Sequence, residues 1–459
     1  MLFVGLAVLA LAAQPAEAQA QPSTSPAQVP FQAELNDDLL EPLPNAERQI
    51  KSWDEAIQLA RNLSTDERVA LANLERAAGR SRQALAALLP NIRAEASVTL
   101  NVLEPGEPPV GVAPAAPGME KQPTAPLGTA RITATQTIFD LGAHRSLSAA
   151  KASEESAAYS LKEVRRRISL SLARNLVAVA AAERVAEMNR HGLRLALERA
   201  AMTERQFQLG AATQLDLMRV QQDLQLARDA VVAGDEQVRR AREALGLALG
   251  LDQEVGISPS FKIEGLVEES LRQCRRLDSI AERADIAAAR AELEAARKRR
   301  LEALAGYYPT LGLTTSLFGY TTDPAFGRVG SWNVAAVLSV PIWEGGMRGG
   351  LVREREGAEW QAEEALEKAR RDAVVEVTRA HRNVQVAEER LKTAMEARQL
   401  AERADQLTRR SFEIGRATSF ELVQSASALR QADIALAMRE FEWVEARLSA
   451  FLTEAMCEF

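Results

Sequence analysis

The sequence has few of the residues on which most metal and catalytic sites depend. Its 459 residues include two cysteines, Cys274 and Cys457, and three histidines that are isolated from one another. The two cysteines lie far apart and have neither metal-ligand spacing nor the pattern of a disulfide framework. We therefore expect no metal, no cofactor and no disulfide framework. Because no His, Cys or carboxylate cluster converges, we also expect that the protein is not an enzyme.

The chain also lacks a hydrophobic run that could cross a bilayer as a helix. Residues 2–13 are apolar, but a span needs about 20 such residues. Small residues at Ala16, Ala18 and Ala20 follow, which is typical of a secretory signal peptide over residues 1–20. No later run is long enough, so the mature protein is predicted to have no membrane-spanning helix.

The chain also lacks a large excess of charge of either sign. The net charge is −7, acidic and basic residues are interleaved along the chain, and the run Arg165 to Arg167 is too short for a phosphate patch. The sequence has no glycine-rich loop ending in Lys and Ser or Thr that would cradle a nucleotide phosphate. We expect neither nucleic acid nor nucleotide as a ligand.

The chain instead contains one segment twice. The stretch from Arg205 to Leu217 returns from Arg410 to Leu422 at an offset of 205 positions. A second pair relates residues 136–142 to residues 340–346 at nearly the same offset. These echoes indicate two internal structural repeats of about 200 residues each.

Hydrophobic periodicity predicts the elements of each repeat. Strict alternation of apolar and polar residues indicates strands, and apolar stripes without proline indicate helices. Residues 143–208, for example, contain no proline and a single glycine, Gly192. The predicted order is a signal peptide at 1–20, an extended periplasmic lead-in at 21–50, repeats at 51–250 and 251–453, and a tail at 454–459. The first repeat has a helix over 53–89 with a break near residues 62–65, strands at 91–103 and 127–139, and helices at 143–208 and 213–249. The second has a helix at 267–305, strands at 310–320 and 331–343, and helices at 347–413 and 418–452.

These elements are hard to fit into a compact domain. A helix over 143–208 would be roughly 100 Å long, so its apolar stripe must pack against other long helices. Four strands of bilayer-crossing length cannot close a barrel, and open edges are not tolerated in lipid. Three chains would supply 12 strands. A soluble β-sandwich is the alternative for the strands, but the signal peptide, the long helices and the repeat favour a barrel.

With both pairs of repeated segments in this order and spacing, the sequence resembles the TolC family of bacterial outer-membrane efflux proteins along nearly the whole mature chain. There are two motifs. One ends a strand and contains an aromatic residue, then an acidic residue, then glycine. The other is a helix turn of the form Phe-x-Leu/Ile-Gly-x-x-Thr-x-x-Asp/Glu. They are found at Phe139 to Gly142 and Trp343 to Gly346, and at Phe207 to Asp216 and Phe412 to Glu421.

The resemblance implies an α+β membrane protein. It would be a homotrimer with a 12-stranded outer-membrane β-barrel, four strands per chain, continued by a long α-helical periplasmic barrel. Such a protein sits in the outer membrane, in contact with lipid, with a large periplasmic portion. It conducts small molecules passively, as the exit channel of a tripartite efflux system with a periplasmic adaptor and an inner-membrane RND or ABC pump. A type I protein secretion channel is the alternative within the family, and a periplasmic coiled-coil structural protein is the alternative outside it.

The resemblance also places the helix turns at the periplasmic tip of the tunnel. Asp216, Glu421 and Arg416 are expected at the aperture, where three copies of a carboxylate would attract cations and Arg416 would contribute to a closed-state latch. The other tip residues are expected to make the turns and contact the adaptor. Glycine would permit the backbone to turn where a side chain would clash, and threonine would cap the next helix. These other tip residues are Leu209, Gly210, Thr213, Ile414, Gly415 and Thr418. The alternatives are pure turn-making for the glycines and threonines and a solvated surface charge for Glu421.

Overall fold

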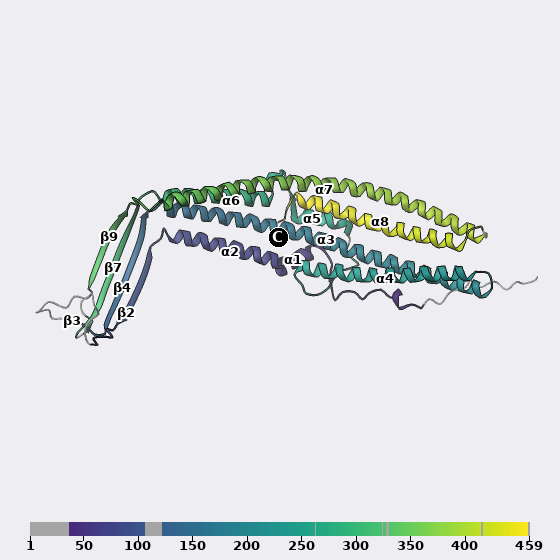
Figure 1. Cartoon of the computed structure of the whole chain (residues 1–459), viewed down its shortest axis with the longest axis horizontal. Coiled ribbons are helices and arrows are strands. Elements are labelled where there is room, and N and C mark those ends of the chain that lie inside the picture. The colour runs from purple at the N-terminus through teal and green to yellow at the C-terminus, as the bar shows by residue number, and fades with distance from the viewer. Residues whose placement is uncertain are drawn as a thin grey trace, which may run out of the picture.

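The computed structural model describes residues 36–105, 122–261, 263–323, 325–326, 330–414 and 416–457. This part of the chain is elongated, with a narrow sheet at one end and long helices along the remainder (Figure 1). The predicted signal peptide, residues 21–35 of the predicted lead-in, Gly415 and residues 458–459 of the predicted tail lie outside the described residues.

Two very long helices determine the length of the molecule. They contain 68 and 67 residues, which corresponds to about 100 Å each at 1.5 Å per residue. Each reverses at the end far from the sheet into a shorter helix, and a further helix lies beside each one near the sheet (Figure 1). None of the described helices is both long and apolar enough to cross a membrane. The helices are α2 (Thr65–Ala86), α3 (Leu141–Gln208), α4 (Gln214–Leu249), α6 (Ala284–Ala305), α7 (Met347–Glu413) and α8 (Ser419–Thr453).

The sheet is antiparallel and has the order β2-β4-β7-β9. Its register aligns Ile132 with Leu317 and Leu317 with Trp332, so these three apolar residues share one face. One position along, Arg131 is opposite Phe318 on the other face, which also carries most of the Thr and Ser residues. The sheet therefore has the predicted apolar face and polar face. The strands are β2 (Asn91–Thr99), β4 (Leu127–Phe139), β7 (Thr310–Asp323) and β9 (Ser331–Ser339), with the short β3 (Gln122–Pro123) and β8 (Ala325–Phe326) beside the far end of β7.

Neither the edges nor the apolar face of this sheet is covered within the described residues. β2 pairs only with β4, and β9 pairs only with β7. The apolar side chains project from the sheet without a partner layer: Trp332 is 76% exposed and Val334 is 63% exposed. No second sheet packs against them in the described ranges, so the β-sandwich alternative is not supported.

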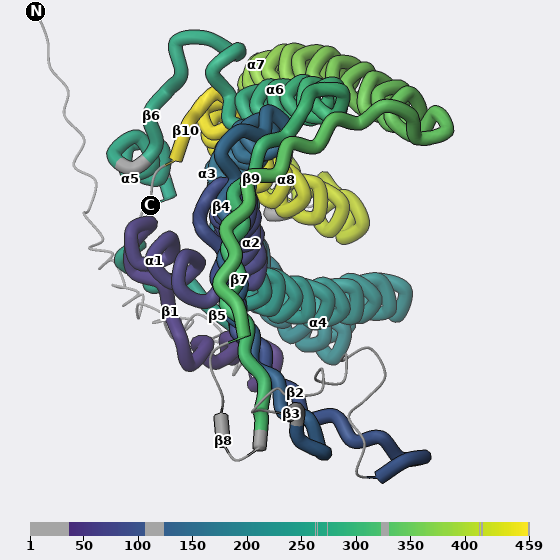
Figure 2. The backbone as a smooth tube through the Cα atoms, turned by 90° about the vertical axis from the view of Figure 1, so that its left-hand side faces the viewer, coloured from purple at the N-terminus to yellow at the C-terminus, as the bar shows by residue number. Residues whose placement is uncertain are grey.

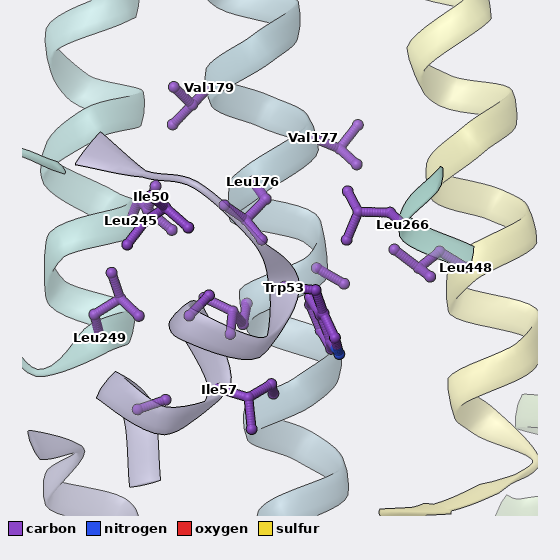
Figure 3. Packing of buried hydrophobic residues seen from close by; sticks show 14 of the residues in the cluster. Ile50, Trp53, Ile57, Leu176, Val177, Val179, Leu245, Leu249, Leu266 and Leu448 are labelled. Carbon is purple, nitrogen blue, oxygen red and sulfur yellow. The ribbon is translucent and has the colours of Figure 1, made fainter. Parts of the chain in front are cut away.

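The main hydrophobic core lies midway along the helices. Trp53 and Ile57 of α1 (Trp53–Leu63) pack between α3, α4 and α8, together with Leu266 of α5 (Leu266–Gln273) (Figure 3). Two short parallel strands, β1 (Arg48–Ile50) and β5 (Val255–Ile257), bring Ile50 into the same cluster. This core holds the two helical hairpins together where the short helices meet end to end.

The expectation of no disulfide framework was wrong in one respect, because Cys274 and Cys457 form a disulfide. The bond joins β6 (Cys274–Arg276) to β10 (Ala455–Cys457), two antiparallel strands that pair across 183 residues of sequence. Spacing along the chain could not indicate this pairing, because it depends on α8 returning to the middle of the molecule.

The other differences concern where elements end. The helix predicted over 267–305 is two helices, α5 and α6, because the intervening residues leave the helix to form β6 and a 3-10 turn at Ile280–Glu282. Part of the predicted tail forms β10. β9 ends at Ser339, four residues before the predicted end, because Pro341 has no N–H to donate to a ladder. β2 ends at Thr99 and α2 at Ala86, both earlier than predicted, whereas β7 runs three residues further, to Asp323.

Candidate functional site

The first helix turn reverses the chain between α3 and α4. Its tight geometry comes from Gly210, which has a φ of +76°, and from the N–H of Ala211, which donates to the carbonyl of Gln206 at 2.8 Å. A Cβ at Gly210 would meet no atom within 4 Å. Glycine is therefore favoured here by the left-handed backbone, and the expectation that a side chain would clash was wrong for Gly210.

The second turn, between α7 and α8, repeats this pattern. The N–H of Arg416 donates to the carbonyl of Ser411 at 2.8 Å, and this bond lies 205 positions after the bond from Ala211 to Gln206. Ile414 is exposed at the end of α7, as Leu209 is at the end of α3. The predicted role of Gly415 falls outside the described residues.

Both threonines cap the helices that follow them, as predicted. The N–H of Asp216 donates to Thr213 Oγ1 at 3.2 Å, and the Asp216 carboxylate accepts from the N–H of Thr213 at 3.2 Å. The N–H of Glu421 donates to Thr418 Oγ1 at 3.3 Å, and Glu421 Oε2 accepts from the N–H of Thr418 at 2.7 Å. Each acidic residue thus completes a capping box that satisfies N–H groups at a helix N-terminus.

The two hairpins also contact each other at these helix starts. The Asp216 carboxylate accepts a hydrogen bond from the hydroxyl of Ser419 on α8. The guanidinium of Arg219 lies 5.3 Å from the centre of the Phe420 ring. A cavity of about 140 Å³ between the hairpins has Asp216 and Ser419 in its lining. Ser419 was not predicted, because no sequence motif relates it to Asp216.

These hydrogen bonds keep both carboxylates ionised. Donation from Ser419 and then from Thr213 lowers the pKa of Asp216. Donation from the Thr418 backbone and then from its side chain lowers the pKa of Glu421. Arg416, predicted as a latch, is exposed and makes no salt bridge with any described side chain. The structure brings Asp216 and Ser419 together. No described salt bridge joins Arg416 to Asp216 or to Glu421.

A second connection between the hairpins lies deeper along the helices. Asp223 of α4 is buried and accepts from Arg199 of α3 at 2.8 Å, while Arg430 of α8 approaches its other oxygen at 3.9 Å. The Arg430 stem passes over Gly192, where a Cβ would lie 2.6 Å from Arg430 Cδ. Gly192 thus makes room for an arginine from the other hairpin. The isolated glycine in an otherwise glycine-free segment was the available sequence signal.

The described residues contain no group of His, Cys, Asp and Glu that could hold a metal ion. The tip, at the end of the two long hairpins, contains helix caps and a hydrogen bond between the hairpins, with exposed apolar residues around them.

The comparison with protein families decides the assignment. A family model described as outer membrane efflux protein matches residues 56–251 and 278–451, well over half of the chain. The chain belongs to the outer membrane efflux protein family. The resemblance inferred from the two motif pairs is thereby confirmed.

Solved structures of similar fold show which known proteins this efflux family protein resembles in architecture. The outer membrane protein VceC from Vibrio cholerae is 19% identical with a TM-score of 0.71, covering 87% of this chain and 95% of its own. CusC is 17% identical with a TM-score of 0.74, covering 90% and 96%. The CmeC outer membrane channel of Campylobacter jejuni is 15% identical with a TM-score of 0.73, covering 92% of both chains. At these identities the likeness concerns the fold. No curated protein sequence matches the chain significantly.

Proposed function

We propose that this efflux family protein is the outer-membrane exit channel of a tripartite efflux system and acts as a homotrimer. The observation that carries the proposal is the sheet of β2, β4, β7 and β9, which has two unpaired edges and an exposed apolar face. In a bilayer, exposed edges leave N–H and C=O groups unsatisfied. Three copies pairing edge to edge give a closed 12-stranded barrel with apolar residues toward lipid and Thr, Ser and Arg toward water.

The location of the helices in this proposal is the periplasm. A disulfide between Cys274 and Cys457 favours an oxidising compartment, and the periplasm is one. The helical part also has apolar side chains such as Trp360 on faces that no described element covers. In a trimer, helices of the neighbouring subunits cover part of these faces and complete a tunnel from the barrel to the tip.

The tip is proposed as the end that meets a periplasmic adaptor. Leu209 and Ile414 are 75% and 68% exposed, and both stand at the outermost turns. An adaptor with an apolar surface of matching shape would bury them. In the trimer, Asp216 and Glu421 would contribute three carboxylates each around the aperture and attract cations. The link from Asp216 to Ser419 would restrain the closed state. Arg416 is retained as a proposed aperture residue, although its partner would have to come from another subunit.

The test is export by cells that lack their own outer-membrane exit channel. Such cells should regain resistance to small toxic compounds when this chain is expressed with a cognate adaptor and pump. The purified protein should run as a heat-sensitive trimer and conduct ions in planar bilayers. A monomer that fails to insert and conduct would refute the proposal. Restored secretion of a protein substrate, without small-molecule resistance, would instead favour the type I secretion alternative.

A further inference from the structure

A groove lies on the helical layer between the sheet and the hydrophobic core. Four helices follow one another across this curved layer in the order α2, α3, α6 and α7 (Figure 2). A cavity of about 640 Å³ is lined by residues of all four. Because the two outermost helices both line it, the groove lies on the concave side of the layer. That volume is within the range of small-molecule sites, roughly 300–1,000 Å³.

The groove carries an excess of positive charge. Arg76 and Arg80 are one helical turn apart on α2, and Arg355 reaches the groove from α7. Neither Arg76 nor Arg80 has a salt bridge to a described residue, and Arg355 is only within 3.9 Å of Glu354. Among these lining residues, Glu302 is the one carboxylate left to offset three guanidinium groups.

The remaining charged pair in the groove is internally neutral. Arg299 donates to Glu292 at 2.8 Å and to the hydroxyl of Ser153 at 2.5 Å. Small residues of α3 form the floor, including Ser146 and Ser160. Hydroxyl donors on the floor and guanidinium donors on opposite walls are the groups that hold carboxylates and phosphates.

We propose that this groove binds small anions that carry two or more carboxylate or phosphate groups. It rests on the proposed function, because the concave side faces the lumen only if three copies close a tunnel. Guanidinium groups pair with planar oxyanions through two parallel N–H donors, and those of α2 and α7 face the groove from its two sides. The channel would then favour anionic cargo at this level, whereas the acidic residues at the tip would favour cations.

The experiment measures equilibrium binding of inorganic pyrophosphate to the detergent-purified protein at low ionic strength, where Coulomb attraction is least screened. Arg76→Gln with Arg80→Gln, and Arg355→Gln alone, should each weaken binding at least about fivefold, since each removes a charge-assisted contact. Arg82→Gln on α2 and Arg353→Gln on α7 are matched controls, because both are exposed arginines outside the groove lining. These controls should leave binding unchanged.

Two outcomes overturn the proposal: wild-type protein that binds no pyrophosphate, or groove variants that bind as the controls do. Arg355→Gln keeps the test valid if the double variant does not assemble. Pyrophosphate block of ion current in planar bilayers gives the second measurement, with the same ranking of variants. Absence of any conductance in the wild type would count against the proposed channel, while the binding measurement would still decide on the groove.

Discussion

The carboxylate of Asp216 accepts a hydrogen bond from the hydroxyl of Ser419, although 203 residues separate them in the sequence. Asp216 lies in the first turn of α4 and Ser419 is the first residue of α8, so the bond joins the ends of the two hairpins. The same carboxylate completes the capping box with Thr213. One side chain therefore both stabilises its own helix start and restrains the neighbouring hairpin.

Ser419→Ala should loosen the contact between the hairpins while leaving both capping boxes intact. A hydrogen bond to a charged group contributes about 1.5–3 kcal/mol when buried, and solvent at the tip reduces this to about 1 kcal/mol. If the link restrains the closed state, open probability in planar bilayers should rise about fivefold. Ser425→Ala is the control, since Ser425 bonds Asp405 at 3.0 Å within the α7–α8 hairpin. Equal effects in both variants would contradict a specific role for the link.

The same link predicts the pH at which the tip loosens. Hydrogen bonds from Ser419 and Thr213 lower the pKa of Asp216, so its carboxylate stays ionised below the ordinary value of about 3.9. The stabilisation is complete above that value and is lost as the pH falls through the lowered pKa. Conductance should therefore be constant from about pH 8 to 5 and rise only below about pH 3.9. The Ser419→Ala channel should show a smaller rise. A rise that begins near pH 6 would contradict the assignment to Asp216.

Much of the fold could be predicted because its signals are local. The alternation in the first strand follows directly from one wet and one dry face, and the long helix after Asp140 has no residue that would interrupt it. Thr213 and Thr418 precede acidic residues at capping-box spacing, so their role as helix caps could also be predicted. Each of these features depends on residues within a few positions of one another.

The contacts that were missed all join distant parts of the chain. The disulfide of Cys274 and Cys457 and the bond from Ser419 to Asp216 depend on where α8 lies after the chain has crossed the molecule twice. Arg166 and Arg283 share the carboxylate of Glu376 in the same way, across three helical segments. No periodicity records such contacts, because they are made by packing between hairpins.

Loss of the disulfide should destabilise the middle of the molecule. The bond closes a loop of more than 180 residues, and disulfides typically contribute about 2–5 kcal/mol by restricting the unfolded chain. Cys457→Ser should lower the temperature at which the trimer dissociates on a gel, and a reductant should do the same to the wild type. Reductant should not affect Cys274→Ser with Cys457→Ser. Unchanged dissociation in the single variant would mean that β6 and β10 are held by other contacts, such as Arg276 to Glu454 at 2.8 Å.

A charged side chain should destabilise the protein much more on one face of β9 than on the other. Val334 is opposite Thr315 on the face that carries Trp332, whereas Ala335 is opposite Thr314 on the polar face. If the first face contacts lipid, Val334→Arg should cost about 2–4 kcal/mol near the bilayer centre. Ala335→Arg should cost little, because its side chain would extend into water. The measurement is the free energy of unfolding from lipid vesicles, with the yield of heat-sensitive trimers in the outer membrane as the cellular counterpart. Equal losses for both variants, or a larger loss for Ala335→Arg, would exclude the proposed orientation of the sheet.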